Sequence, residues 1–210
     1  MQAADLRTEY TLAGLRRRDL DPDPIQQFQR WFEQAVAAQV PEPNAMTLAT
    51  VDEEGQPSAR TVLLKGIDRR GLSFYTNYQS RKGRELAQNP KAALTIFWAG
   101  LERQVCLRGT CARLPREESE VYYRSRPLGA RLGAWVSSQS TAIPDREFLE
   151  RRLAEVQTQY GENPPLPEYW GGFALDPVTV EFWQGRPNRL HDRFRYAREG
   201  NGWRVERLSP

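Results

Sequence analysis

Hydrophobic positions follow a helical period in two long stretches of this 210-residue sequence. The first comes directly after Asp23-Pro24, a capping residue and a proline suited to the first helical turn. Its apolar positions are Ile25, Phe28, Phe32, Ala35 and Val36. The second follows Asp145, and its stripe consists of Leu149, Leu153, Val156 and Tyr160. Both stretches are predicted to be helices, the first facing the core and the second facing the core or a partner.

Shorter helices are indicated by their capping signals. Ser80-Arg-Lys-Gly83 opens a helix that Asn89-Pro90 closes. Pro115-Arg-Glu-Glu118 places a proline and two acids in a first turn, and that helix is expected to stop near Arg126-Pro127. A brief helical piece is predicted over residues 132–137.

Strand-like patterns account for most of the remaining chain. They cover residues 46–51, 58–65, 72–76, 92–98 and 103–114, a stretch near Phe173, and residues 179–183, 192–196 and 203–208. Short polar turns join the first three strands, which predicts an antiparallel meander. Eight or nine strands with three or four helices between them favour a mainly β fold with flanking helices (α+β), built on an antiparallel barrel. A doubly wound sheet is disfavoured because helices and strands do not alternate regularly.

The chain is predicted to form a single domain over residues 24–210, preceded by a polar segment over residues 1–23. That segment ends in Asp21-Pro-Asp-Pro24 and is expected to be mobile. It is charged throughout and has no apolar run, so we expect no secretory signal. No stretch of the sequence is apolar over the length that a membrane span requires.

Composition adds limits on the class of protein. The formal net charge is only +3, so the basic residues do not by themselves imply a nucleic-acid surface. Cys106 and Cys111 have opposite parity in one predicted strand and cannot easily pair, so we interpret both as reduced residues of a cytoplasmic protein. No dinucleotide fingerprint, P-loop or Cys/His metal spacing is present, and we predict no metal.

The segment near the C-terminus concentrates aromatic and cationic residues: Trp183, Arg186, Arg189, His191 and Arg193. If the run from Arg189 is extended, Arg189, His191 and Arg193 share one face. Such a row suits an anionic, planar ligand. The alternative is that His191 is a structural or surface residue, which is the commoner role of a lone histidine.

Two upstream motifs are candidates for binding anions. Arg60 and Lys65 stand at the two ends of an apolar strand and leave it by different faces, although two solvated strand ends explain them equally well. Ser80-Arg-Lys-Gly83 combines free backbone N–H groups at a helix start with two cations and a hydroxyl, which together form a phosphate site. Short basic helix starts also occur on plain surfaces.

These motifs belong to a longer ordered set. The set comprises Arg60-Thr-Val-Leu-Leu-Lys-Gly66, Phe74-Tyr-Thr-Asn77, Ser80-Arg-Lys-Gly83, Arg103-Gln-Val105, Ser138-Gln-Ser140, Trp170-Gly-Gly172, Glu181-Phe-Trp-Gln-Gly185 and Asn188-Arg-Leu-His-Asp-Arg193. In this order they resemble the pyridoxine/pyridoxamine 5′-phosphate oxidase family. The resemblance runs from Arg7 to the closing Arg207-Leu-Ser-Pro210, and Arg189-Leu-His-Asp-Arg193 is its most specific part.

The resemblance implies a split-barrel flavoprotein that works as a homodimer with FMN at the subunit interface. The positions that match FMN contacts are Arg60, Thr61, Val62, Leu63, Leu64, Lys65, Tyr75, Thr76, Arg81, Lys82, Gln104, Gln139 and Ser140. Trp183 and Arg193 match FMN contacts supplied by the other subunit.

The resemblance also implies a substrate site. Lys65, Tyr122 and Arg126 match the grip on the substrate phosphate. Arg189 and His191 match the residues packed against the pyridine ring at the reacting carbon, and we expect them to be the catalytic pair. Residues that match a mobile lid over this site are Arg7 and Tyr10.

One position departs from the family pattern. Leu128-Gly-Ala130 stands where a serine that helps to hold the substrate phosphate is expected. A missing neutral hydrogen bond of this kind costs on the order of 1 kcal/mol, which raises the Michaelis constant several-fold without abolishing turnover. Arg131 is a candidate to compensate.

The activity implied is oxidation of pyridoxamine or pyridoxine 5′-phosphate to pyridoxal 5′-phosphate, with O2 as acceptor and H2O2 released. FMN carries that chemistry, so the protein supplies alignment and charge. Three alternatives remain open: a split-barrel flavoprotein with another substrate, a vitamer or flavin carrier without turnover, and a basic RNA-binding module. An RNA-binding module would need a clustered basic face with exposed aromatic platforms, which this sequence lacks.

Overall fold

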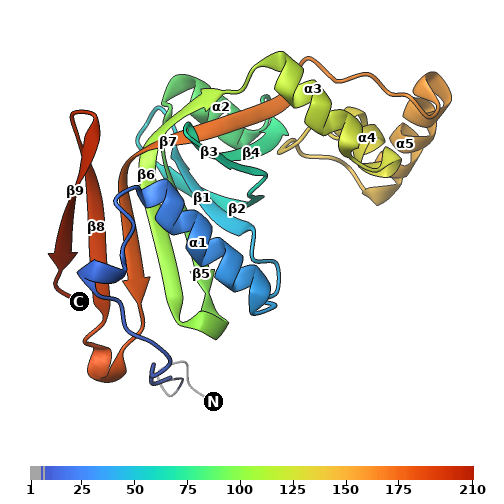
Figure 1. Ribbon diagram of the computed structural model, residues 1–210. Coiled ribbons are helices and arrows are strands. Elements are labelled where there is room, and N and C mark those ends of the chain that lie inside the picture. Colours follow the sequence, from blue (N-terminus) through green and yellow to red (C-terminus); the bar gives the residue numbers. More distant parts are fainter. Residues whose placement is uncertain (1–5, 7) are drawn as a thin grey trace.

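The core of the molecule is a curled antiparallel sheet (Figure 1). The computed structural model describes residues 6 and 8–210. Its strands are β1 (Ala45–Val51), β2 (Pro57–Leu63), β3 (Gly66–Asp68), β4 (Gly71–Asn77), β5 (Lys91–Trp98), β6 (Arg103–Arg113), β7 (Trp170–Gln184), β8 (Asp192–Glu199) and β9 (Gly202–Leu208). They are ordered β2-β1-β5-β6-β7-β4-β3, with β8 joining β7 to β9. The predicted mainly β, antiparallel architecture is confirmed.

Strand β7 is the branch point of the sheet. Its first part pairs with β4, its last part pairs with β8, and its other edge pairs with β6 along most of its length. The register shifts where Arg108 faces Thr179 and Gly109 faces Pro177, which leaves Val178 as an extra, bulged residue. The separate strands predicted near Phe173 and over residues 179–183 are therefore one continuous strand.

The predicted meander of the first three strands is wrong. β1 pairs with β2, but β4 pairs with β3 and β7. The chain changes course at Leu64 and Lys65, whose backbone N–H groups donate to Asn44 O (2.8 Å) and Ser73 O (2.8 Å). The alternation of apolar residues identifies these strands but does not encode which strand each one pairs with.

Five α-helices accompany the sheet in the described part of the chain: α1 (Pro24–Ala37), α2 (Arg81–Gln88), α3 (Arg116–Ser125), α4 (Leu128–Val136) and α5 (Arg146–Tyr160). Three of them begin at the caps that the sequence predicted: Asp23 accepts from Ile25 N, Ser80 from Gly83 N and Asp145 from Phe148 N. The sequence predicted three or four helices, fewer than the five described here. The short helical piece predicted over residues 132–137 is part of the longer α4.

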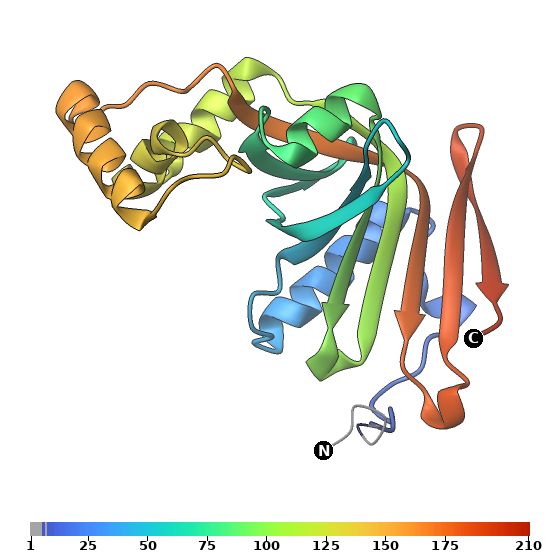
Figure 2. The same ribbon diagram turned by 180° about the vertical axis from the view of Figure 1, so that it is seen from behind.

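Helix α1 and the last three helices lie in different parts of the molecule (Figures 1 and 2). α1 lies across the concave face of the sheet and buries Phe28 and Trp31 in the main core. Helices α3, α4 and α5 extend beyond the sheet as an arm. On α5 the predicted stripe is only partly covered, because Val156 is buried while Leu153 is 39% exposed.

Part of the N-terminal segment packs against the sheet. Leu15 is buried in the main core, and Tyr196 on β8 donates its hydroxyl hydrogen to Asp21 O at 2.7 Å. Residues 1–5 and Arg7 lie outside the described residues, and the mobility of the whole segment stays a prediction. None of the described helices combines the length and apolarity needed to cross a membrane.

Candidate functional site

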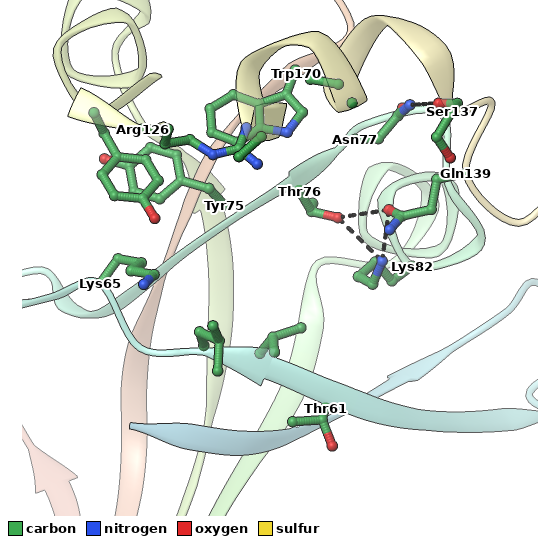
Figure 3. Close-up of a pocket in the computed structure, with 16 residues that line it drawn as sticks. Thr61, Lys65, Tyr75, Thr76, Asn77, Lys82, Arg126, Ser137, Gln139 and Trp170 are labelled. Atoms are coloured by element: carbon green, nitrogen blue, oxygen red, sulfur yellow. Dashed lines mark hydrogen bonds between the residues drawn. The ribbon is translucent and has the colours of Figure 1, made fainter. Parts of the chain in front are cut away.

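A cavity of about 410 Å³ opens between the end of β2, strand β4, the start of α2 and the arm (Figure 3). Its size is typical of a small-molecule site. Many of the residues matched to FMN line it: Thr61, Val62, Leu63, Lys65, Tyr75, Thr76, Lys82 and Gln139. The residues matched to the substrate phosphate, Lys65, Tyr122 and Arg126, line the same cavity. The fold thus brings residues from separate strands and helices between positions 61 and 139 into one cavity.

Lys82 provides a buried cation at one side of this cavity. Its ammonium donates to Thr76 Oγ1 (3.1 Å) and Gln139 Oε1 (3.0 Å), as Figure 3 shows. Burial, and then the charge of Arg60, lowers the pKa of Lys82 to about 8. An anion would favour the charged form again. The start of α2, with Ser80 as its cap, adds a helix N-terminus to the same side.

Arg60 lies behind the cavity wall in a buried polar cluster. Its guanidinium contacts Glu85 Oε2 (3.2 Å) and bonds to the hydroxyls of Thr50 and Ser58. Burial opposes ionisation of Glu85, but the hydrogen bonds from Thr50 and Ser58 and the charge of Arg60 outweigh it and lower the pKa of this carboxyl. Glu85 therefore remains an anion that fixes Arg60 beside Lys82.

A second pair of cations lies over aromatic rings in the same cavity. Tyr75 stacks on Tyr122 at 4.0 Å and on Trp170 at 5.5 Å. Lys65 Nζ lies 5.8 Å from the Tyr122 ring centre, and the Arg126 guanidinium 4.7 Å from that of Trp170. Arg126 Nη1 is buried and, among the described residues, donates to no acceptor. These groups are arranged to bind a second anion.

The position of the missing serine lies in the wall of this cavity. Ala130 lines it together with Gly133 and Ala134, which follow on the same face of α4. Arg131 does not take the place of the serine, because its Nη2 donates to Glu162 O (3.2 Å) and it is absent from the lining. The sequence motifs missed Gly133, Ala134 and Ser137 and gave Asn77 no role, and a helix predicted to start at Leu128 would have found the first two.

A further cavity, of about 490 Å³, lies at the other end of β7. Leu6, Thr8, Glu9 and Tyr10 form one wall, and Arg186, Asn188, Arg189 and His191 form the other. Asn188 and Arg189 have left-handed backbone (φ 56° and 59°), so the run from Arg189 is a turn and the extended strand starts only at Asp192. The condition for Arg189, His191 and Arg193 to share one strand face is therefore not met.

His191 is held in one orientation. Its Nδ1 accepts a hydrogen bond from the backbone N–H of Arg186 (3.1 Å). The centre of its ring lies 4.6 Å from the ring centre of Trp183 and 6.0 Å from that of Tyr10. Burial, and then the charges of Arg189 and Arg193, lowers the pKa of His191. The neutral ring with its proton on Nε2 is the form that fits these surroundings.

Gln104, Trp183 and Arg193 stand beside one another on β6, β7 and β8. Paired positions in adjacent strands point to the same face, so these three side chains form a row. Arg193 Nε donates to Glu181 Oε1 at 2.8 Å. This hydrogen bond raises the pKa of Arg193, although burial acts in the opposite direction. The row lies near the second cavity, away from Lys82.

The remaining matched positions lie outside both cavity walls. Leu64 is buried in the main core, whereas Arg81 is exposed at the first position of α2. Ser140 is exposed with a left-handed backbone (φ 71°) one residue after Gln139. Arg7 falls outside the described residues.

The two cavities are far apart within one chain. Trp170 lines the first and Trp183 lies beside the second, and about 40 Å of strand separates them along β7. Lys65 and Arg126 are therefore separated from Arg189 and His191 within one chain, and their expected meeting in one site at a subunit interface stays a prediction.

Family comparisons cover most of the chain. Residues 32–160 match the model described as pyridoxamine 5′-phosphate oxidase, and residues 170–210 match the pyridoxine 5′-phosphate oxidase C-terminal dimerisation region. The chain belongs to the pyridoxamine 5′-phosphate oxidase family. Strands β7, β8 and β9 thus form the dimerisation region of a pyridoxamine 5′-phosphate oxidase family member.

Named relatives of this oxidase family span the whole sequence. The chain is 57% identical to the pyridoxine/pyridoxamine 5′-phosphate oxidase of Cupriavidus taiwanensis, covering 100% of the chain and 99% of the relative. It is 58% identical over 208 residues to the enzyme of the same name from Paraburkholderia phymatum, covering 99% of the chain and 98% of the relative.

Two solved structures share the fold of this chain. PhzG from Burkholderia lata, in complex with tetrahydrophenazine-1-carboxylic acid, superimposes with a TM-score of 0.88 at 35% identity, covering 92% of this chain and 95% of that one. A pyridoxamine 5′-phosphate oxidase-related, FMN-binding protein from Nostoc punctiforme has a TM-score of 0.72 at 20% identity, covering 91% of this chain and 100% of that one. At that identity the likeness is one of fold. The split-barrel prediction is confirmed.

Proposed function

We propose that the chain is an FMN-dependent oxidase that converts pyridoxamine and pyridoxine 5′-phosphate to pyridoxal 5′-phosphate, with O2 as acceptor and H2O2 released. The observation that carries this proposal is the presence of two separate cationic positions in one cavity. Lys82 at the start of α2 is one, and Lys65 with Arg126 over the aromatic rings is the other. FMN and the substrate each bring a phosphate, so the cavity has a partner for both.

The residues of the first cavity fit FMN. Lys82, held by Thr76 and Gln139, and the α2 start suit its phosphate, and Arg60 adds charge from behind the wall. Thr61, Val62 and Leu63 present the end of a strand to its ring. Bound FMN would supply a two-electron acceptor for the substrate and a route for those electrons to O2.

A complete site requires two chains in this proposal. Within one chain Lys65 and Arg126 are remote from Arg189 and His191, and β7 to β9 belong to the dimerisation region. The partner subunit's Arg189 and His191 would complete the site around Lys65 and Arg126. Gln104, Trp183 and Arg193 form one row on the same chain as Arg189 and His191. From that chain they would contact the FMN that the other subunit holds in its first cavity.

The substrate contacts that we propose are supported by the charges and hydrogen bonds of the chain. Arg126 offers its buried Nη1, which has no acceptor among the described residues, to the substrate phosphate, and Lys65 and Tyr122 complete that grip. Arg189 covers the pyridine ring. His191 accepts from Arg186 through Nδ1, so its free Nε2–H is the group that orients the substituent on the reacting 4′ carbon.

With both cysteines free, we place the enzyme in the cytoplasm.

The visible spectrum of the purified protein under anaerobic conditions tests this proposal. We expect a yellow flavin band that bleaches when pyridoxamine 5′-phosphate is added and returns with air, with H2O2 formed. A flavin band that stays unchanged would point to a different substrate or to a carrier. A colourless protein that cannot take up FMN would overturn the assignment of Lys82 and the α2 start.

A further inference from the structure

Glu102, at the turn before β6, is a buried carboxylate to which the proposed chemistry gives no role. The residue is only 7% exposed. Its two oxygens accept separate backbone hydrogen bonds, Oε1 from Thr11 N (3.2 Å) and Oε2 from Leu12 N (3.0 Å). Bonds to an ionised acceptor are stronger than those between neutral groups. Glu102 thus fixes the backbone of the N-terminal segment across the start of β6.

The backbone of Glu102 joins the same segment to the end of β7. Glu102 has a left-handed conformation (φ 52°), which costs energy for a residue other than glycine. In this conformation its carbonyl accepts from Gly185 N (2.7 Å) and Gln184 Nε2 (3.2 Å). The loop that carries Arg186 to His191 begins at this point. One residue therefore bonds to the two segments that lead into the walls of the second cavity: residues 11 and 12 on one side, and Gln184 and Gly185 on the other.

Tyr10 is the side chain that this arrangement places. Its ring contacts Trp183 at 5.5 Å and His191 at 6.0 Å, in both cases edge-on. A Cβ on Gly185 would lie 2.7 Å from Tyr10 Cβ and Cγ, so the tyrosine packs directly on the bare glycine backbone. The bonds to Thr11 and Leu12 follow Tyr10 immediately in the chain. They leave its position little freedom.

We propose that Glu102 is a positioning residue for the substrate site, fixing residues 11 and 12 so that Tyr10 is held against Trp183 and His191. The effect on the substrate rests on the proposed function, whereas the attachment of the segment does not. Arg186 and Asp192 reinforce the attachment through Ala13 O (3.0 Å) and Leu15 N (3.0 Å). They lie beyond Glu102 and do not contact the backbone of residues 11 and 12.

Limited trypsin digestion of the full-length holoenzyme, followed by mass spectrometry, tests the attachment. Arg16, Arg17 and Arg18 are exposed and give cleavage sites just after the segment. In Glu102→Gln and Glu102→Gly, cleavage there should be about tenfold faster than in the wild type, as expected when charge-assisted bonds are lost and the open state is more populated. Glycine tolerates the left-handed backbone, so the second variant removes the carboxylate without backbone strain.

Glu42 gives the matched control. It is also a left-handed glutamate (φ 43°), but it is exposed and does not bond to the N-terminal segment in the described structure. Glu42→Gln and Glu42→Gly should be cut at the wild-type rate. Equal cleavage rates in the Glu102 variants and the wild type would overturn the proposal.

A double-mutant cycle with Tyr10→Ala separates positioning from general destabilisation. Glu102→Gln should raise the Michaelis constant for pyridoxamine 5′-phosphate about tenfold with little change in kcat, and should add almost nothing in the Tyr10→Ala background. Fully additive effects would refute action through Tyr10. If the wild type oxidised neither vitamer, the proposed function would fail, while the trypsin comparison would still decide whether Glu102 holds the segment.

Discussion

His191 Nδ1 accepts the backbone N–H of Arg186 at 3.1 Å, which leaves Nε2 as the nitrogen that can face a ligand. Burial, and then the charges of Arg189 and Arg193, lowers the pKa of His191 below its ordinary value of 6.5. The ring is therefore neutral at pH 6.5 and above, and it takes up a proton only at lower pH. Protonation of Nδ1 would break the bond to Arg186. We therefore expect kcat/KM to fall on the acid side through a pKa below 6.5.

His191→Asn tests this assignment, because the shorter amide can still accept from Arg186 but cannot supply Nε2–H. kcat/KM should fall at least about tenfold and the acid limb should disappear from the pH profile. An unchanged acid limb in the variant would assign that titration to another group.

FMN affinity should depend on the charge of Lys82. The pKa of Lys82 is lowered to about 8, so the free protein loses this charge above that pH and must take up a proton to bind phosphate in the same way. FMN should bind well below pH 8 and progressively more weakly above it, as followed by quenching of flavin fluorescence. Lys82→Met should weaken binding about tenfold to a hundredfold and flatten this pH dependence. Lys91→Met, at an exposed lysine, is the control.

Arg126 should govern recognition of the substrate phosphate. Its buried Nη1 has no acceptor among the described residues, so the substrate is expected to supply one. Arg126→Ala should lower kcat/KM for pyridoxamine 5′-phosphate about a hundredfold while leaving FMN binding nearly unchanged. Arg124→Ala, which removes an exposed arginine on α3, should have no such effect. Weakened FMN binding in Arg126→Ala would instead place this arginine in the cofactor site.

Ala130 gives a prediction in the opposite direction. It lines the cavity near Arg126, at the position where the family pattern has a serine, and Arg131 is directed to Glu162 instead. Ala130→Ser should restore a hydrogen bond worth about 1 kcal/mol and lower the Michaelis constant about fivefold. Ala142→Ser, in an exposed loop, controls for the added hydroxyl. A Michaelis constant that does not fall would show that the phosphate lies out of reach of position 130.

Local signals in the sequence predicted local structure well. Asp23, Ser80 and Asp145 cap helices as expected because a cap depends on only three or four neighbouring residues. Pairing of β4 with β7 could not be read in this way, since those strands are distant in sequence and each satisfies the same alternation.

The candidate site was predicted in parts. The motifs identified Lys65, Lys82 and Arg126, which the fold brings into one cavity. They did not show that His191 lies at the far end of β7, because the resemblance supplies residue roles without distances. The left-handed turn at Asn188 and Arg189 was also beyond the pattern, since neither residue is a glycine.

The length of β7 makes the two halves of the proposed site genetically separable. Trp170 at its start and Trp183 near its end belong to different cavities, so each dimer site would draw one half from each chain. Mixing Arg126→Ala chains with His191→Asn chains would then place both lesions in one site of a hybrid dimer and leave its other site intact. After subunit exchange, two preparations with strongly reduced kcat/KM should give a mixture with about a quarter of the wild-type kcat/KM. Sites confined to single chains would show no such recovery.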